Sequence, residues 1–271
     1  MGGLRKKLWK EYVGGKQTLT QLSEQYGRSH VWVRKQLDTI VVPAPEIVPQ
    51  PTVVIADTTF WGRHYGVCVF RSSELKKNIW WHEVINELMA HYYYAKKILE
   101  ERGWSFTAAV VDGRRGLFNV FKGIPVQMCQ FHQIKIVIRY ITTRPKTEAG
   151  RELLALVLTL TKTNEKAFTE ALNAWHTKWE SFINEMTVNT FVSGKTTSYH
   201  THKGVYSAYH SLKRNLPHLF TYQKYPELNI PNTTNDLDGS FSALKKKLAA
   251  HHGLRKDRRY KVISKLLRDG V

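Results

Sequence analysis

The segment from Val53 to Gln130 alternates between strand-like and helical patterns in an order that few folds accommodate. Three short apolar runs, separated by short turns, predict strands that pair antiparallel. A helical pattern, a buried strand, a short helix and a final strand follow. The predicted elements are strands Val53–Asp57, Tyr65–Phe70 and Ile79–Glu83, helix Val84–Arg102, strand Phe106–Asp112, helix Gly116–Phe121 and strand Pro125–Gln130. This order predicts an α/β fold.

Helical spacing dominates the next part of the chain, from about residue 133 to 225. Apolar residues recur there at intervals of three and four, the spacing of one helix face. The series are Ile134, Val137, Ile138 and Ile141, then Leu153, Leu154, Leu156, Val157 and Leu160, then Phe168, Leu172, Trp175, Trp179, Phe182 and Ile183. The predicted helix Val84–Arg102 has the stripe Ile85, Leu88, Met89, Tyr92 and Leu99. The segment from about residue 133 to 225 is too long to be a structureless loop, and we expect it to be all-helical.

The first forty residues match the pattern of a helix-turn-helix domain, residues 1–42. Leu4 to Tyr12 predicts a basic amphipathic helix. Thr18, with Gln21 three residues later, predicts a capping box. Gly27 predicts a sharp turn, and Ser29 predicts the N-cap of a further helix. The expected packing positions are Leu19, Leu22, Tyr26, Val31, Val33 and Leu37.

The early exposed positions of the last predicted helix are those that would face a DNA groove. They are Ser29, His30, Trp32 and Arg34, with Lys35 beyond. In helix-turn-helix proteins such positions read base edges while basic groups hold phosphates. The alternative is a plain helical hairpin used for protein contacts.

A proline-rich segment separates these helices from the rest of the chain. Pro43, Pro45, Pro49 and Pro51 fix the backbone and remove donors, so neither a helix nor a central strand is expected. We predict an extended linker over residues 43–52 and a second domain over 53–271.

The charge balance favours a polyanionic partner. The 271 residues include 41 Lys and Arg against 22 Asp and Glu, a net charge of +19 with a pI near 9.9. No apolar run approaches the roughly 20 residues that span a bilayer, and no signal peptide is visible. Cys68 and Cys129 provide no disulfide framework, which indicates a reducing compartment.

Three aspartates occupy positions that suit a metal-bound carboxylate. Asp57 and Asp112 end predicted strands, and Asp238 lies one turn inside a helix opened by Asn232–Asn235. Carboxylates are the ligands that Mg²⁺ and Mn²⁺ prefer. The alternatives are a turn residue at a strand end and an acid favoured by the helix dipole. Asp236 and Asp238 flank the same apolar stripe of Leu237, Phe241, Leu244 and Leu248, so helical geometry permits either acid.

Four stretches carry a resemblance to a known family: Ile55–Phe60, Val110–Leu117, Cys129–His132 and Thr233–Gly239. Together, and in this order, they resemble the Mutator-like DDE/D transposases of bacterial insertion sequences, in the ribonuclease H-like superfamily. The resemblance runs from about Val53 to Leu248. The family usually has Glu where this chain has Asp238, a side chain one methylene shorter.

The resemblance implies a ribonuclease H-like mixed sheet with an all-helical insertion over about 133–225. In that fold the first and fourth strands lie side by side, which would bring Asp57 near Asp112. The family spacing after Thr-Asn selects Asp238 as the third catalytic acid. Asp57 would contact both of two Mg²⁺ or Mn²⁺ ions, with Asp112 and Asp238 each holding one.

The implied function is a DNA transposase. It would bind element ends, hydrolyse phosphodiesters with two divalent cations, and join the exposed 3′-OH to target DNA. Joining two ends implies a homodimer or larger complex on double-stranded DNA. The resemblance to bacterial transposases implies a location in the cytoplasm of a prokaryote, at the nucleoid. The alternatives are a non-catalytic DNA-binding regulator and a nuclease of the same fold without strand transfer.

Further residues are candidates for supporting roles. Cys129 and His132 lie near the active site in family terms, and a buried cysteine before a helix-opening histidine is the alternative. A zinc site is not expected, since no second Cys-x-x-Cys or paired His cluster completes four ligands. The candidate DNA-backbone contacts are Arg114, Arg115, Lys245, Lys246 and Lys247, and the alternative is a solvated basic surface. Trp175 and Trp179 would either stack on unpaired bases or belong to the core.

Overall fold

The computed structural model describes residues 2–114, 116–191, 195–251 and 253–270, which form two compact units. The first unit comprises residues 1–105 and 235–271, and the second comprises residues 106–234. The strands β1 to β5 make a five-stranded mixed sheet. Their order along the chain, three strands, a helix, a strand, a short helix and a strand, is the predicted one.

Three helices open the first unit: α1 (Gly2–Val13), α2 (Leu19–Tyr26) and α3 (His30–Asp38). The predicted caps are confirmed. Thr18 and Gln21 form the reciprocal capping box, and Ser29 accepts a hydrogen bond from the Trp32 amide. Gly27 ends α2 with φ 58°, a left-handed conformation that glycine adopts without steric cost.

The predicted exposure of two α3 side chains is wrong. Val31 is 49% exposed and does not pack inward, because Val33 and Leu37 form the inner face of this helix. Trp32 is half-buried and not exposed, and the Arg28 guanidinium lies 5.6 Å from its ring centroid. Ser29, His30, Arg34 and Lys35 are exposed as predicted.

The segment between α3 and the first strand is extended, as the prolines predict. Residues 40–50, all of them described, have neither helix nor strand. Strand β1 begins at Pro51, two residues before the predicted start, so the linker ends earlier than residue 52.

An antiparallel meander follows, made of β1 (Pro51–Phe60), β2 (Gly66–Ser72) and β3 (Lys77–Val84). The predicted antiparallel pairing is confirmed. The helix predicted from Val84 begins only at Met89, as α4 (Met89–Glu101). Val84 pairs with Gly66 in the β2–β3 ladder, so strand pairing overrides the helical pattern there.

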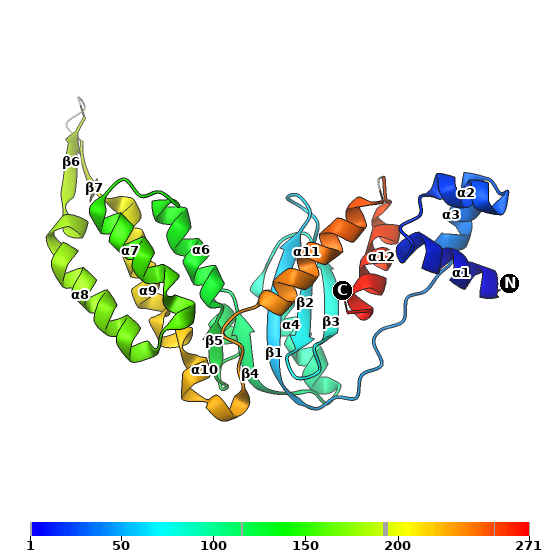
Figure 1. Ribbon diagram of the computed structural model, residues 1–271, viewed down its shortest axis with the longest axis horizontal. Helices are drawn as coiled ribbons and strands as arrows, with labels where there is room; N and C mark the ends of the chain where they lie inside the picture. The colour runs from blue at the N-terminus through cyan, green and yellow to red at the C-terminus, as the bar shows by residue number, and fades with distance from the viewer. Residues whose placement is uncertain (1, 115, 192–194, 252, 271) are drawn as a thin grey trace. The chain divides into compact units, whose positions relative to one another are not determined.

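Different helices cover the two faces of this meander (Figure 1). On one face the Thr58 hydroxyl lies 2.9 Å from the Tyr92 hydroxyl of α4. On the other, Asn78 Nδ2 donates to the Leu267 carbonyl at 2.9 Å, and Trp81 Nε1 donates to Ser264 Oγ at 3.0 Å. Leu267 and Ser264 belong to α12 (Lys256–Arg268), which packs with α11 (Asn235–Ala249).

An ion pair joins the amino-terminal helices to α12. Arg258, only 4% exposed, donates from Nε and Nη2 to the two carboxylate oxygens of Asp38 at 2.8 and 2.7 Å. The rings of Tyr12 and His251 lie 4.4 Å apart in the same region. The three helices are therefore held against the carboxy-terminal helices within one compact unit.

Replacing Asp38 by Asn is expected to lower the free energy of unfolding by about 1–3 kcal/mol, the range for a buried group that loses its partner, because Arg258 would keep a buried charge without its counter-ion. Denaturant titration measures the change. Asp269→Asn is the matched control, since Asp269 pairs with Lys265 at the surface and its loss should cost less than about 0.5 kcal/mol. Equal losses in the two variants would show that the Asp38 pair contributes no more than a surface ion pair.

The second unit contains a parallel strand pair and a helical body. Strand β4 (Ser105–Val111) pairs with β5 (Val126–Met128), with Val111 opposite Met128. The helices are α5 (Leu117–Val120), α6 (Gln130–Ile141), α7 (Glu148–Leu158), η1 (Leu160–Lys162), α8 (Glu165–Asn184), α9 (Lys203–Leu219), α10 (Thr221–Lys224) and η2 (Pro226–Leu228). Their apolar faces form one core.

The prediction that residues 133–225 are all-helical is wrong. An exposed hairpin of β6 (Met186–Thr190) and β7 (Thr196–His200) follows α8. The threonines and Val188 of this hairpin favour strands, but their side chains are mostly exposed. The sequence therefore lacks the alternation of apolar and polar residues that would predict these strands. Trp175 is 5% exposed and donates to the Ala149 carbonyl, which confirms the core alternative for this residue. Among the described helices, none is long and apolar enough to cross a membrane.

Candidate active site

Asp57 lies inside β1, so the prediction that it ends a strand is wrong. The strand continues to Phe60, because Thr58, Thr59 and Phe60 stay paired with Cys68, Val67 and Gly66. The carboxyl group is 6% exposed, and its Oδ1 accepts a hydrogen bond from the Thr58 amide at 2.7 Å. Side chains alternate along a strand, so Asp57 faces away from the Thr58–Tyr92 contact and toward the side that α11 and α12 cover.

Helix α11 carries the two candidates for the third acid. The stripe of Leu237, Phe241, Leu244 and Leu248 is buried, as predicted. Asp238 is half-buried beside it, and Asp236 is exposed. Asp57 and both α11 acids therefore lie on the same side of the meander, within the first unit.

The buried Arg71 lies within electrostatic reach of Asp236 on α11. Burial lowers the pKa of the Arg71 guanidinium, and the nearby negative charge of Asp236 partly offsets that shift. Arg71 also donates to Asn78 Oδ1 at 3.2 Å. The choice of Asp238 over Asp236 stays a prediction from the spacing after Thr-Asn in the sequence.

Asp112 follows the last residue of β4 directly. Its Oδ1 accepts from the Arg114 amide at 2.9 Å, and Arg114 Nε lies 3.9 Å from its Oδ2. The Arg114 side chain is exposed. Arg115, the other predicted contact here, lies outside the described residues.

Cys129 and His132 lie at the junction of β5 and α6, beside the end of β4. The Cys129 amide donates to the Val111 carbonyl at 2.8 Å, one residue before Asp112. Cys129 is buried and His132 is in the first turn of α6, which agrees with the alternative of a buried cysteine before a helix-opening histidine. A role of the two residues near the active site stays a prediction. Parallel strands bring these groups together because their carboxyl ends meet at one edge of the sheet.

Thr234 is a partner of Cys129 that the sequence pattern did not indicate. Its amide and hydroxyl both donate to the Cys129 sulfur, each at 3.3 Å. Burial raises the pKa of the Cys129 thiol, but hydrogen bonds and charge from His132, together with Thr234, outweigh it and leave the pKa lowered. The Cys129 sulfur therefore fixes the backbone that leads into α11.

The three candidate acids do not all belong to one unit. Over the described ranges, no group of three or more His, Cys, Asp or Glu side chains is placed to hold a metal ion. Asp57 and Asp238 belong to the first unit and Asp112 to the second. The convergence of the three acids stays a prediction.

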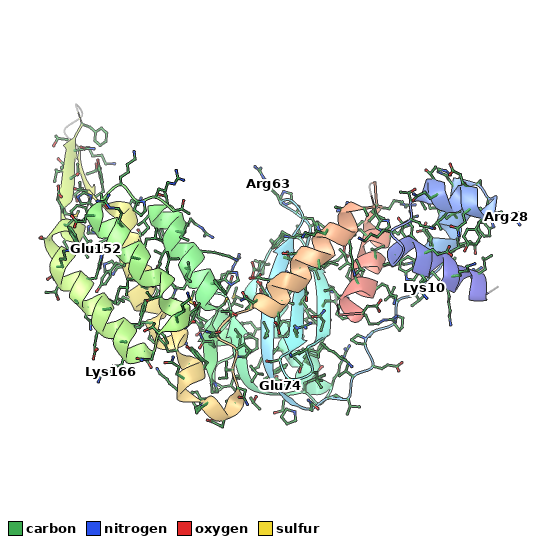
Figure 2. The ribbon with its side chains drawn as sticks, in the orientation of Figure 1. Lys10, Arg28, Arg63, Glu74, Glu152 and Lys166 are labelled. Atoms are coloured by element: carbon green, nitrogen blue, oxygen red, sulfur yellow. The ribbon has the colours of Figure 1, made fainter. Side chains whose placement is uncertain are left out.

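A basic groove of about 920 Å³ lies in the first unit, between α1, the start of the linker, α11 and α12. Its charged lining is Arg5, Lys6, Lys10, Lys247, Lys265, Arg268 and Asp269, six cations against one acid. Asp269 is paired with Lys265 at 2.6 Å. Figure 2 labels Lys10 on α1 and Arg28 in the turn between α2 and α3. Of the predicted C-terminal contacts, Lys247 lines this groove and Lys245 and Lys246 are exposed on α11.

Comparison with known proteins finds similar solved structures, but no match to the sequence. No family model and no curated protein match the sequence. The chain is similar to a Drosophila P element transposase strand transfer complex, with 11% identity and a TM-score of 0.39 over 89% of this chain and 85% of that one. It is also similar to the large terminase nuclease from thermophilic phage G20c, with 12% identity and a TM-score of 0.22 over 66% and 95%. Likeness at this level assigns no role to any residue.

Proposed function

We propose that the protein is a DNA-cutting enzyme with a ribonuclease H-like fold, and specifically a transposase of the Mutator-like DDE/D kind. The observation that carries the proposal is the position of Asp57. Asp57 is a buried carboxylate inside β1, and it faces the side where α11 brings Asp238, so two of the three candidate acids lie on one side of the meander.

The donor chemistry of the three acids fits two divalent cations. Asp57, Asp112 and Asp238 offer carboxylate oxygens, which Mg²⁺ and Mn²⁺ prefer over nitrogen and sulfur. When bound, such ions supply Lewis acidity toward an attacking water and a departing phosphodiester oxygen. Arg114 offsets charge at Asp112, and His132 with Cys129 orders the chain around that acid.

The basic groove supports DNA as the partner. Six cations around one groove attract a phosphate backbone, and such binding weakens steeply with salt. The exposed start of α3 would read base edges. Two DNA ends joined in one reaction require a homodimer or larger assembly, which is part of the proposal.

The test is incubation of the protein with duplexes that cover the DNA flanking its gene, with Mg²⁺ or Mn²⁺. Cleavage followed by joined products supports a transposase. Cleavage without joining favours a nuclease of the same fold. Tight binding with neither product, in both metals, favours a non-catalytic regulator.

The recognition role of α3 has a separate test. Arg34→Gln is expected to reduce the preference for duplexes selected from random sequence by about tenfold, because a base contact is worth roughly 1–3 kcal/mol. Competition binding at fixed salt measures the preference. Lys166→Gln is the control, since Lys166 is exposed on α8 in the second unit (Figure 2). Unchanged preference in Arg34→Gln and Lys35→Gln would place the reader elsewhere.

A further inference from the structure

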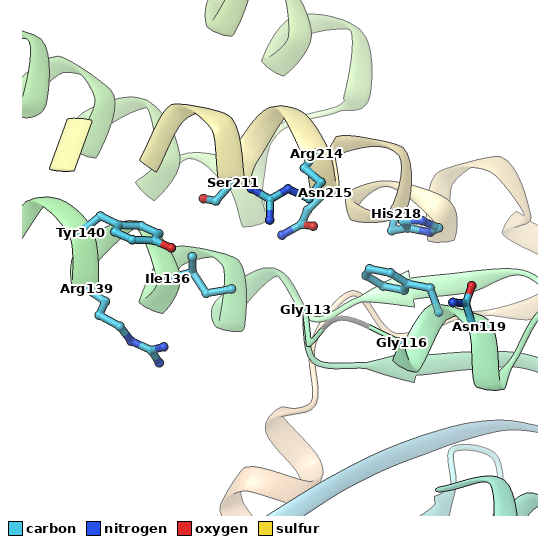
Figure 3. A pocket seen from close by; sticks show the side chains of 11 residues that line it. Gly113, Gly116, Asn119, Ile136, Arg139, Tyr140, Ser211, Arg214, Asn215 and His218 are labelled. Carbon is cyan, nitrogen blue, oxygen red and sulfur yellow. The ribbon is translucent and has the colours of Figure 1, made fainter. Parts of the chain in front are cut away.

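A pocket of about 580 Å³ lies in the second unit between α5, α6 and α9 (Figure 3). Its size falls within the roughly 300–1,000 Å³ of small-molecule sites. All of its lining residues belong to the second unit. None of the three acids lines it, so the chemistry proposed above leaves it without a role.

The pocket combines cations with aromatic rings. Arg139 reaches it from α6 and Arg214 from α9, and both side chains are exposed. Phe118 and His218 line the pocket as a stacked pair with centroids 4.1 Å apart and planes 10° apart. Burial lowers the pKa of the His218 imidazole, which favours its neutral form. Guanidinium groups bind phosphates, and aromatic rings stack on nucleobases.

The polar groups of the pocket are held in place by a buried glutamine. Asn215, 6% exposed, donates from Nδ2 to Gln133 Oε1 at 2.7 Å. Gln133 Nε2 in turn donates to Ser211 Oγ at 3.1 Å. Asn215 and Ser211 both line the pocket, so its hydrogen-bonding groups are fixed before a ligand arrives.

The pocket begins one residue after Asp112. Gly113 lines it, and a Cβ at this position would lie 2.1 Å from Met128 Cε. A larger residue here would therefore have to displace the end of the Met128 side chain where the chain leads from Asp112 into the pocket wall. A ligand here would occupy the space next to the second acid.

We infer that this pocket takes an unpaired nucleotide of the DNA strand, its phosphate held by Arg139 and Arg214 and its base stacked at Phe118 and His218. The inference rests on the proposed function, because DNA is the polyanion that reaches Asp112. A pocket that binds both a base and a phosphate requires a ligand that carries both groups. A DNA strand that is unpaired beside the cleavage point supplies such a nucleotide. Paired bases in a duplex present only their edges and cannot stack on these rings.

The test compares three DNA probes without a divalent metal, so that no cleavage occurs. They are a blunt duplex, the same duplex with one unpaired terminal nucleotide, and that probe with the unpaired position abasic. The wild-type protein is expected to bind the second probe about tenfold more tightly than the others. Arg139→Gln with Arg214→Gln, and separately Phe118→Leu, should reduce this preference to less than about twofold.

A charge-matched control separates the pocket from general attraction. Lys213→Gln with Arg144→Gln removes two exposed cations of the second unit that do not line the pocket. This control should keep the preference while it weakens binding of all probes alike. Thermal unfolding of each variant establishes that the fold is retained.

Three results would overturn the inference. They are equal wild-type affinity for the three probes, a preference unchanged in the pocket variants, and tight binding of free deoxyadenosine monophosphate that the pocket variants lose. The last result would make a free nucleotide the ligand in place of a DNA strand. Absence of binding to every DNA probe would instead contradict the proposed function itself.

Discussion

Asp57→Asn is expected to reduce DNA cleavage at least about a thousandfold while leaving DNA affinity within about twofold. Asn has nearly the shape of Asp and can still accept the Thr58 amide bond through its Oδ1, so the strand should fold. It lacks the negative charge that would compensate divalent cations. Cleavage of flanking-sequence duplexes with Mg²⁺ and with Mn²⁺, beside binding without metal, measures both quantities.

Asp112→Asn should behave like Asp57→Asn, although its acid is only half-buried and is bonded to Arg114. The matched control is Asp257→Asn, an exposed acid in the first turn of α12. It should cleave at the wild-type rate. Wild-type cleavage in Asp57→Asn or Asp112→Asn would remove that residue from the chemistry, whatever the control shows.

Local chemistry decided which parts of the fold were predictable. Thr18, Gln21, Gly27 and Ser29 act on backbone groups within a few residues, so the sequence alone predicts the caps of α2 and α3. The apolar stripe of α11 is equally local, since one helix face repeats every three to four residues. The order of strands and helices followed from the same kind of pattern.

Long-range partners decided what was not predictable. The prediction that the first strand ends at Asp57 was wrong. The strand continues to Phe60, because pairing with β2 continues to the pair Phe60–Gly66. The Arg258–Asp38 ion pair spans 220 positions and the Thr234–Cys129 bonds span 105, and no local pattern marks either. The three acids themselves were found from motif resemblance, whereas the structure added that Asp236 has Arg71 as a partner.

The choice between the two α11 acids leads to the second large expected effect. Asp238→Ala is expected to abolish cleavage, with a loss of about a thousandfold or more, because it removes one of three metal-binding carboxylates. Asp236→Ala should keep most of the activity, because the spacing after Thr-Asn in the sequence selects Asp238 as the third acid; the charge of Asp236 lies near the buried Arg71. It should instead lower the free energy of unfolding modestly, by about 0.5–1 kcal/mol, the range of an exposed charge pair.

Asp238→Glu separates the reach of the acid from its charge. The longer side chain is the one that the Mutator-like transposases of the proposal usually carry, but it enters a helix position that holds Asp in this chain. We expect partial or better activity, with Mn²⁺ more permissive than Mg²⁺ because Mg²⁺ demands near-ideal octahedral geometry. Cleavage rates of Asp238→Ala, Asp236→Ala and Asp238→Glu with each metal give the comparison. An active Asp238→Ala beside an inactive but folded Asp236→Ala would transfer the third carboxylate to Asp236 and leave Arg71 as its positioning partner.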